Sequence, residues 1–294
     1  MDIVLQLAVN GILIGGIYGL VSVGLTLIFG VMRLINFAQG EFITLGMYAA
    51  FWFYLGVGGN PYLSLLAVVP ASLAIGWGLE RTLFRRMGSA PPAMQMLVTF
   101  GLSLALQNAM LLVFGGDYRA VRNSFARETL TLGGIHVSVA QLIAFLASIG
   151  IGLLLMLSLN RTRTGRALRA VQQNRYAIQL MGVNIQRLFA IAFAIGTSLA
   201  AVAGVLLAPS YFISPTIGAG LVFTGFVVVV LGGLGSLGGA IFGGLMIGVI
   251  ESFSGFYLPS GLKDTVPLAV FVLVLIVKPA GLFGVRGAEE VGFK

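Results

Sequence analysis

Apolar runs close to the ~20 residues that a membrane-spanning helix requires recur along the whole chain, with the charged residues between them. Inside a bilayer only helices and closed barrels satisfy all their backbone hydrogen bonds. Membrane barrels alternate polar and apolar residues in strands of about ten, whereas these runs are continuous. The sequence therefore predicts an all-α fold, a polytopic transmembrane helical bundle.

Composition supports this class. Hydrophobic residues make up 58% of the chain and charged residues 9%, whereas about 25% of a soluble domain is charged. A soluble enzyme, a disordered protein and a fibrous protein are therefore excluded. The basic excess, 17 Lys and Arg against 9 Asp and Glu, lies in short loops. Membrane topology explains that placement better than nucleic-acid binding.

We predict about eight spans: eight long segments plus one short or re-entrant segment. The first is no cleavable signal, because Asp2 stands where such a signal is basic and the apolar stretch is too long. It has an irregular start near Asn10. The segments are Ile3–Val31, Phe37–Val57, Tyr62–Leu79, Ala93–Phe114, Val137–Leu159, Leu188–Ala208, the short Gly218–Leu231, Leu237–Leu258 and Thr265–Phe283. Together they form one transmembrane domain over residues 1–294.

The basic residues predict the orientation, because Lys and Arg are retained on the cytoplasmic side. Thirteen of the seventeen share one side: Arg33, Arg81, Arg85, Arg86, Arg161, Arg163, Arg166, Arg169, Arg175, Arg187, Lys278, Arg286 and Lys294. The N-terminus is then outside and the C-terminus cytoplasmic, which requires an odd number of crossings. The region 218–258 either crosses twice or is re-entrant. A small outside hairpin is predicted around Gly133 and Gly134.

The largest cytoplasmic element is the segment 160–187. Thr164 is placed to cap a helix on which Leu168 and Val171 share one face and arginines occupy another. A second short segment follows Asn174 and stops at Gly182. The pattern predicts an amphipathic helix under the membrane. It fits either a helix that binds lipid headgroups or a docking element for a cytoplasmic partner.

Three further features are candidates for function. Asn36, Gln39 and Glu41 lie between the first two spans, where Arg33 and Glu41 are able to pair, although a turn capped by Asn36 explains them equally well. Glu251 is the one acid in an apolar run, either a proton site, a gate or an interfacial residue.

Glycine is the third feature. The chain has 42 glycines, many spaced by four, which indicates tight helix packing. The break containing Gly232, Gly233, Gly235 and Ser236 is a candidate lining of a solute path, because irregular backbone at membrane depth is tolerated beside a cavity. His136 fits an interfacial loop better than a metal site, and no metal is predicted. No phosphate-binding or dinucleotide motif is present, so ATP would bind to another chain.

Three motifs, in order, resemble the LivH-type permease of bacterial branched-chain amino acid ABC importers. They are the stretches 16–20 and 24–41, the loop 164–184 and the glycine block 231–240. The resemblance covers essentially the whole chain. The loop lacks the acidic residue that begins the coupling signature of other importer classes, as is normal for this family.

The resemblance implies a coupling segment at 160–187, with Gly165, Arg166, Ala167, Arg169, Ala170, Asn174, Ala177 and Gly182 as its contact residues. It implies a permease subunit of the bacterial inner membrane and not an enzyme, with leucine, isoleucine and valine as solutes. The implied partners are a second homologous permease in a heterodimer, two ATP-binding subunits, an extracytoplasmic solute-binding protein and the bilayer. No cofactor is implied on this chain.

Other functions stay open at this point. Relatives of similar architecture move urea, short amides, other amino acids or sugars. An ion-coupled secondary transporter would use Glu251 and the glycine break as its site, and a passive channel would need no energy source.

Overall fold

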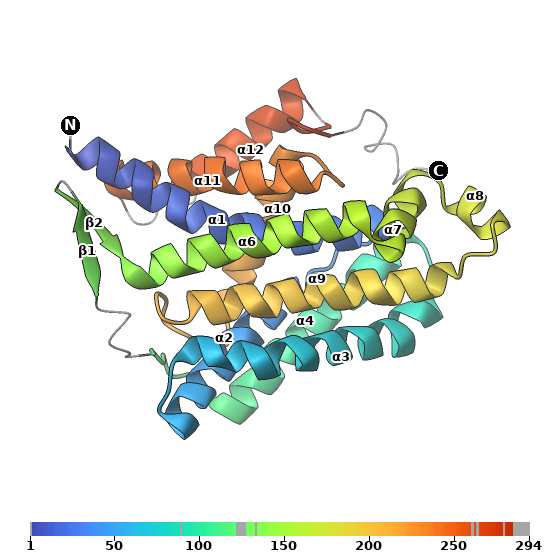
Figure 1. The fold of residues 1–294 in the computed structure, drawn as a ribbon, viewed down its shortest axis with the longest axis horizontal. Helices are drawn as coiled ribbons and strands as arrows, with labels where there is room; N and C mark the ends of the chain where they lie inside the picture. Colours follow the sequence, from blue (N-terminus) through green and yellow to red (C-terminus); the bar gives the residue numbers. More distant parts are fainter. Residues whose placement is uncertain are drawn as a thin grey trace.

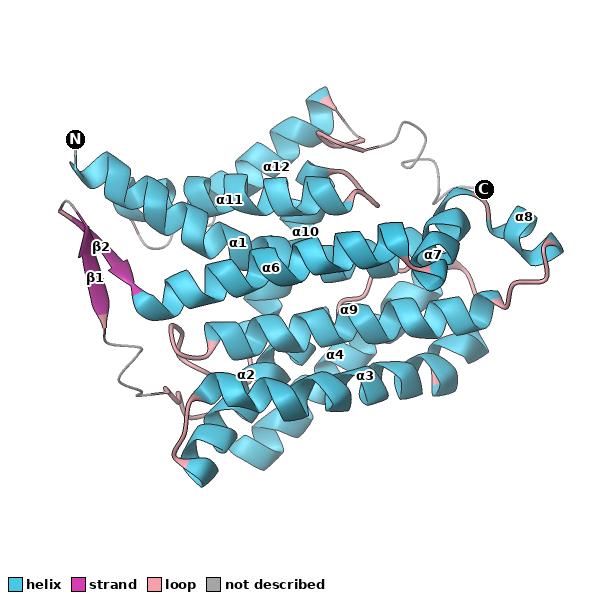
Figure 2. Cartoon of the chain, in the orientation of Figure 1, coloured by secondary structure: helices cyan, strands magenta, loops and turns pink. Residues whose placement is uncertain are grey.

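The computed structural model describes residues 2–88, 90–121, 128–132, 134–259, 262, 265–278 and 280–284 (Figures 1 and 2). The helices are α1 (Asp2–Met32), α2 (Gln39–Val57), η1 (Pro61–Ser64), α3 (Leu65–Thr82), η2 (Phe84–Met87), α4 (Pro92–Phe114), α6 (Val139–Arg161), α7 (Arg163–Gln173), α8 (Arg175–Leu180), α9 (Ile185–Leu207), α10 (Ile217–Gly232), α11 (Leu237–Tyr257) and α12 (Thr265–Val277). The strands are β1 (Thr129–Leu132) and β2 (Ile135–Ser138).

The long helices run lengthwise between two ends of the molecule (Figure 1). One end, which we call the hairpin end, carries the start of α1 and the antiparallel strands β1 and β2, whose innermost pair is Leu132 with Ile135. The predicted hairpin is thereby confirmed, with Gly134 at φ 88° in its turn and Gly133 outside the described residues. The opposite end, the arginine end, carries α7 and α8.

Among the described residues, six helical segments are long and apolar enough to cross a membrane, which confirms a helical polytopic membrane protein. The predicted segments coincide with helices along the chain. The irregular start near Asn10 is wrong, because α1 is continuous from Asp2 to Met32 and Gln6 Nε2 donates to Asn10 Oδ1 at 3.1 Å within it. In lipid, an unbroken helix lets every backbone N–H and C=O group form a hydrogen bond within the same segment.

The glycine spacing has the structural role predicted for it. Gly11, Gly15 and Gly19 of α1 face Gly244 and Gly248 of α11. A Cβ added at Gly15 would lie 2.7 Å from the carbonyl oxygen of Gly244, so the two backbones are in contact. Small residues at this spacing let helices approach closely without a hydrophobic driving force between them.

Two helices begin inside the bundle and not at its surface. Gln39, at the start of α2, donates from Nε2 to the carbonyl of Gly196 at 2.8 Å, and Gly196 is the midpoint of α9. The start of α10 lies against the start of α2, where a Cβ at Gly40 would collide with the carbonyl oxygen of Gly218. From this contact α2 runs to the hairpin end and α10 to the arginine end (Figure 1).

Segment 208–232 therefore passes from the hairpin end, where α9 finishes, to the arginine end. Its first part consists of turns and one isolated bridge between Ile213 and Arg119, and its second part is α10. α11 then returns antiparallel to α10, since Gly232 packs on Gly239 and a Cβ at Gly243 would lie 2.9 Å from the carbonyl oxygen of Val228. α10 and α11 thus form an antiparallel pair of helices that turns at the arginine end.

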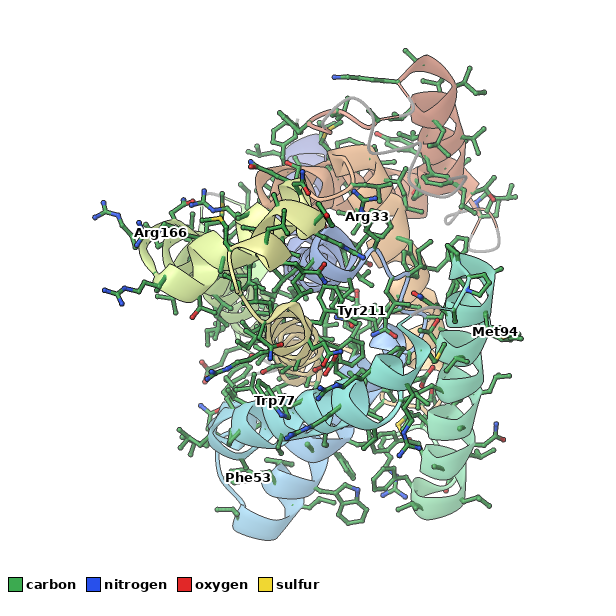
Figure 3. The ribbon with its side chains drawn as sticks, turned by 90° about the vertical axis from the view of Figure 1, so that its right-hand side faces the viewer. Arg33, Phe53, Trp77, Met94, Arg166 and Tyr211 are labelled. Atoms are coloured by element: carbon green, nitrogen blue, oxygen red, sulfur yellow. The ribbon has the colours of Figure 1, made fainter. Side chains whose placement is uncertain are left out.

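The basic residues separate by end as expected. The described members of the predicted cytoplasmic set lie at the end of α1, at the end of α3 and in η2, around α7 and α8 up to the start of α9, and beside the α10–α11 turn. Figure 3, viewed from the arginine end, shows Arg33 and Arg166 of this set. Arg119 lies at the hairpin end, where its Nη2 donates to the carbonyl of Phe114 at 2.6 Å. Arg122, Arg127, Lys263, Arg286 and Lys294 lie outside the described residues.

Candidate functional site

The most exposed candidate site is α7, the arginine-bearing helix. Thr162 caps it, with Oγ1 accepting from the Gly165 amide at 3.0 Å, so the predicted cap at Thr164 is wrong by two residues. Gly165 is the residue where α7 touches the end of α6, because a Cβ there would lie 2.6 Å from the carbonyl oxygen of Ser158. A side chain larger than hydrogen would displace the helix.

The two faces of α7 differ sharply. Leu168 and Val171 are each 1% exposed, in a cluster with residues of α1, α6 and α9, and Ala167 and Ala170 are half-buried. Arg166 and Arg169 are exposed, and Figure 3 shows Arg166 projecting away from the bundle. A headgroup-binding helix inserts its apolar face into the bilayer. Here that face is occupied by the protein itself, which favours a docking element with a polar outer surface.

The short helix α8 continues the same segment. Asn174 caps it, with Oδ1 accepting from the Ala177 amide at 3.0 Å. Gly182 follows its last turn at φ 77°, which confirms the predicted stop. The chain then returns into α9 through a third cap, in which Asn184 Oδ1 accepts from the Arg187 amide at 3.1 Å. Successive caps therefore fix the path of this segment.

A second candidate site is the polar cluster at the start of α2. Asn36 caps the turn before α2 as predicted, but it is not the helix N-cap: that residue is Ala38, which provides no side-chain bond. Instead Asn36 turns inward, accepting from the Ala38 amide at 3.2 Å and donating to Gln39 Oε1 at 3.2 Å. Asn36 and Gln39 are 1% and 0% exposed. The cluster is inside the bundle because α2 begins there.

Glu41 lies in this cluster and faces α4. Its Oε1 accepts from Ser103 Oγ at 3.1 Å, and its Oε2 is buried without a hydrogen-bond partner among the described residues. Arg33 is exposed at the end of α1, so the expected Arg33–Glu41 pair does not form. Thr99 adds a second polar link, from Oγ1 to the carbonyl of Ile35 at 3.0 Å. These polar links attach α4 to the bundle.

The glycine break lies at the arginine end and not at the depth of Glu41. The carbonyl of Gly232 accepts from the Phe283 amide at 3.1 Å, and Gly233, at φ 102°, packs on Gly284. Ser236 caps α11, with Oγ accepting from the Gly239 amide at 3.1 Å. Gly235 shares a small cavity with Arg169 and Gln172 of α7. The break is therefore a neighbour of α7.

Glu251 lines a cavity of about 420 Å³ with Tyr18 and Tyr211, between the start of α10 and α12. Figure 3 shows Tyr211 close to the centre of the bundle when viewed from the arginine end. The sequence singled out Glu251 but missed both tyrosines, as it missed Ser103 beside Glu41. No local signal identifies them, because each meets its acid only through helix packing.

The chain also resembles known proteins along its whole length. The family model described as "Branched-chain amino acid transport system / permease component" matches residues 7–275. The chain belongs to this family of permeases. It is 34% identical to the high-affinity branched-chain amino acid transport system permease protein BraD of Pseudomonas aeruginosa, covering 98% of both chains. It is 33% identical to the corresponding LivH protein of Escherichia coli K12, covering 98% of this chain and 97% of the relative.

A more distant relative is the fructose import permease protein FrcC of Rhizobium meliloti, 26% identical over 92% of this chain and 80% of its own length. The resemblance to LivH-type permeases is thereby confirmed. The permease is a transport subunit of an ABC importer and a multi-pass protein of the inner membrane.

Proposed function

We propose that this permease is one of two homologous membrane subunits of an ATP-driven importer of leucine, isoleucine and valine. Two separate subunits hydrolyse ATP, a solute-binding protein delivers the solute, and this chain binds no cofactor. The supporting observation is α7, a helix whose apolar face is buried in the bundle and whose arginines face outward. The solute is inferred from BraD and LivH, which are named for branched-chain amino acids.

The arginine end is cytoplasmic in this proposal, with the N-terminus outside and the C-terminus inside, because Lys and Arg are retained on the cytoplasmic side. The ATP-binding subunits dock on α7 and contact Arg166 and Arg169. Because Leu168 and Val171 tie α7 to α1, α6 and α9, a displacement of α7 moves those helices with it. ATP shifts the equilibrium between two conformations of the importer only if it binds those conformations with different affinity.

The path for solute involves the polar groups that lie inside the bundle. Asn36, Gln39 and Glu41 mark the level at which α2 and α10 begin, and Glu251 lines the cavity nearer the hairpin end. Gly232, Gly233, Gly235 and Ser236 are assigned to a gate, because the turn that contains them adjoins α7. A movement of α7 would therefore displace this turn directly, through the contact between them.

The test is leucine uptake by proteoliposomes that contain the permease, its co-expressed second permease, both ATPase subunits and the binding protein. Arg166→Glu with Arg169→Glu is expected to lower ATP-driven uptake at least about tenfold, since opposing charge at a docked surface costs a few kcal/mol. Arg85→Glu with Arg86→Glu makes the same charge change on η2 at the same end and is expected to leave uptake within twofold. Equal uptake in both variants would refute docking on α7.

A second candidate is import of a different solute, which the relationship to FrcC favours. A screen of amino acids, urea, short amides and sugars against the co-purified binding protein separates the two candidates. Uptake that persists without ATP in the same vesicles would instead indicate a secondary transporter or a channel.

A further inference from the structure

A cavity of about 390 Å³ lies at the end of α1, and Asn36, which belongs to the proposed solute path, lines one side of it. Its walls come from the last turns of α1, the linker that follows, the first turns of α4 and the last turns of α10. Leu25, Phe29, Phe226 and Val229 make most of it apolar, and Arg33 and Arg175 also line it. The combination of an apolar body and two guanidinium groups is unusual for a packing defect.

Arg33 is held at this cavity by the backbone. It terminates α1 in the left-handed region at φ 56°, with its amide donating to the carbonyl of Phe29 at 2.7 Å. This position normally belongs to glycine or asparagine, and among the described residues Arg33 is the one non-glycine with positive φ. The side chain therefore leaves the helix end in a direction that a helical residue would not have.

Arg175 approaches the cavity from α8 and is fixed in place. Its Nη2 donates to the carbonyl of Val31 at 2.9 Å, and its guanidinium lies 5.2 Å from the centre of the Phe189 ring. Burial lowers the pKa of Arg175, and the nearby charge of Arg33 lowers it further. None of the described residues that line the cavity is Asp or Glu. Two cations thus share an apolar cavity whose described lining contains no acid, and Glu80 lines the adjoining cavity that also includes Arg175.

The surroundings of the cavity indicate which anion would fit. Pro92, Gln95 and Met96 of α4 form one wall, and the outer face of α4 is apolar and exposed, with Leu97 at 64%. α4 is therefore a helix that faces lipid or another membrane subunit. A cavity between helices with basic groups at the membrane surface favours a lipid headgroup, and guanidinium forks bind phosphate through paired hydrogen bonds.

We propose that this cavity binds one anionic phospholipid, with Arg33 and Arg175 holding the phosphate and the apolar walls holding the start of an acyl chain. The site belongs to this chain alone and does not depend on which solute the importer carries. The Arg175 guanidinium is already held in place before lipid arrives, so it loses little side-chain freedom on binding.

The test is native mass spectrometry of the full-length permease in mild detergent, with equal amounts of phosphatidylglycerol and phosphatidylcholine added. Wild type is expected to retain one phosphatidylglycerol with about tenfold preference, because hydrogen bonds to charged groups are among the strongest. Arg33→Asn with Arg175→Gln is expected to abolish the preference. Asparagine suits the backbone at position 33, so this substitution removes the charge and keeps the helix end.

The matched control is Arg161→Gln with Arg163→Gln, two exposed arginines at the same end that do not line the cavity. It is expected to keep the full preference. If the double variant does not give a monodisperse protein, Arg33→Asn alone is measured and is expected to lower the preference at least threefold. The proposal is overturned if wild type shows no preference, if the control loses as much as the cavity variant, or if millimolar glycerol 3-phosphate displaces the lipid completely.

Discussion

Two polar segments interrupt this apolar chain, 160–187 and 33–41, and the fold places them in opposite environments. The first lies on the surface at the arginine end, where each short helix has its own side-chain cap. The polar residues 36–41 of the second are buried, where Gln39 bonds to the midpoint of α9 and Glu41 bonds to α4. A polar segment that satisfies its own backbone stays outside the bundle, whereas one whose side chains find distant partners becomes part of it.

The largest effect on the buried segment is expected from disrupting the contact between α2 and α10. Gly40→Leu would drive a side chain into the backbone of Gly218; overpacking typically costs about 1–3 kcal/mol, and we expect more here because the obstacle is backbone that cannot change rotamer. We expect a sharp fall in folded yield and in the thermal midpoint measured by size-exclusion chromatography after heating. Gly220→Leu is the control, because nothing lies within 4 Å of that position. Equal loss in both variants would show that the close contact is not the cause.

The next largest effect is expected where α7 is attached. Leu168→Ala removes a side chain that is 1% exposed, and such truncations cost about 2–5 kcal/mol. We expect a lower thermal midpoint together with reduced ATP-driven uptake, since the arginine face loses its rigid support. Leu180→Ala on α8, where the leucine is 72% exposed, is expected to change neither quantity measurably. An unchanged Leu168→Ala protein would mean that α7 does not rely on its buried face.

A smaller loss of stability is expected from a substitution in the buried polar cluster at the start of α2. Ser103→Ala leaves both carboxyl oxygens of Glu41 without a partner, which costs about 1–3 kcal/mol. We expect the thermal midpoint of unfolding to fall in proportion to this loss of stability. Ser210→Ala, at an exposed turn, is the control and is expected to leave the midpoint unchanged. The double variant Glu41→Ala with Ser103→Ala measures the coupling, and additive losses would contradict a direct bond.

The smallest effect concerns the cap of α7. Thr162→Ala removes the bond to the Gly165 amide and is expected to cost about 1 kcal/mol. Thr164→Ala, the same change two residues later, removes no cap and is expected to cost less. The difference is measured as the protection of the Arg166 and Ala167 amides from hydrogen exchange. A greater loss of protection in Thr164→Ala would restore the cap first predicted from the sequence.

Much of the fold could be predicted from the sequence because the signals are local. Helix boundaries in lipid follow from apolar length, and the stop at Gly182 follows from residue type. The cap at Thr162 was misplaced because Thr164 has the same chemistry, and packing of Gly165 on α6 selects between them. The sequence singled out Glu41 but not its partner Ser103, because the two residues are 62 positions apart and meet only when α2 packs on α4.

The sequence by itself determined that the chain is a helical membrane protein, that its basic residues gather at one end and that an arginine-bearing helix lies there. Apolar length, charge placement and capping chemistry act over a few residues and need no partner. The tertiary structure alone decided that α2 and α10 begin inside the bundle and that Arg33 and Arg175 share one cavity. The physical reason is that glycine contacts such as Gly40 with Gly218 let two helix starts approach closely, and those contacts exist only after the helices have packed.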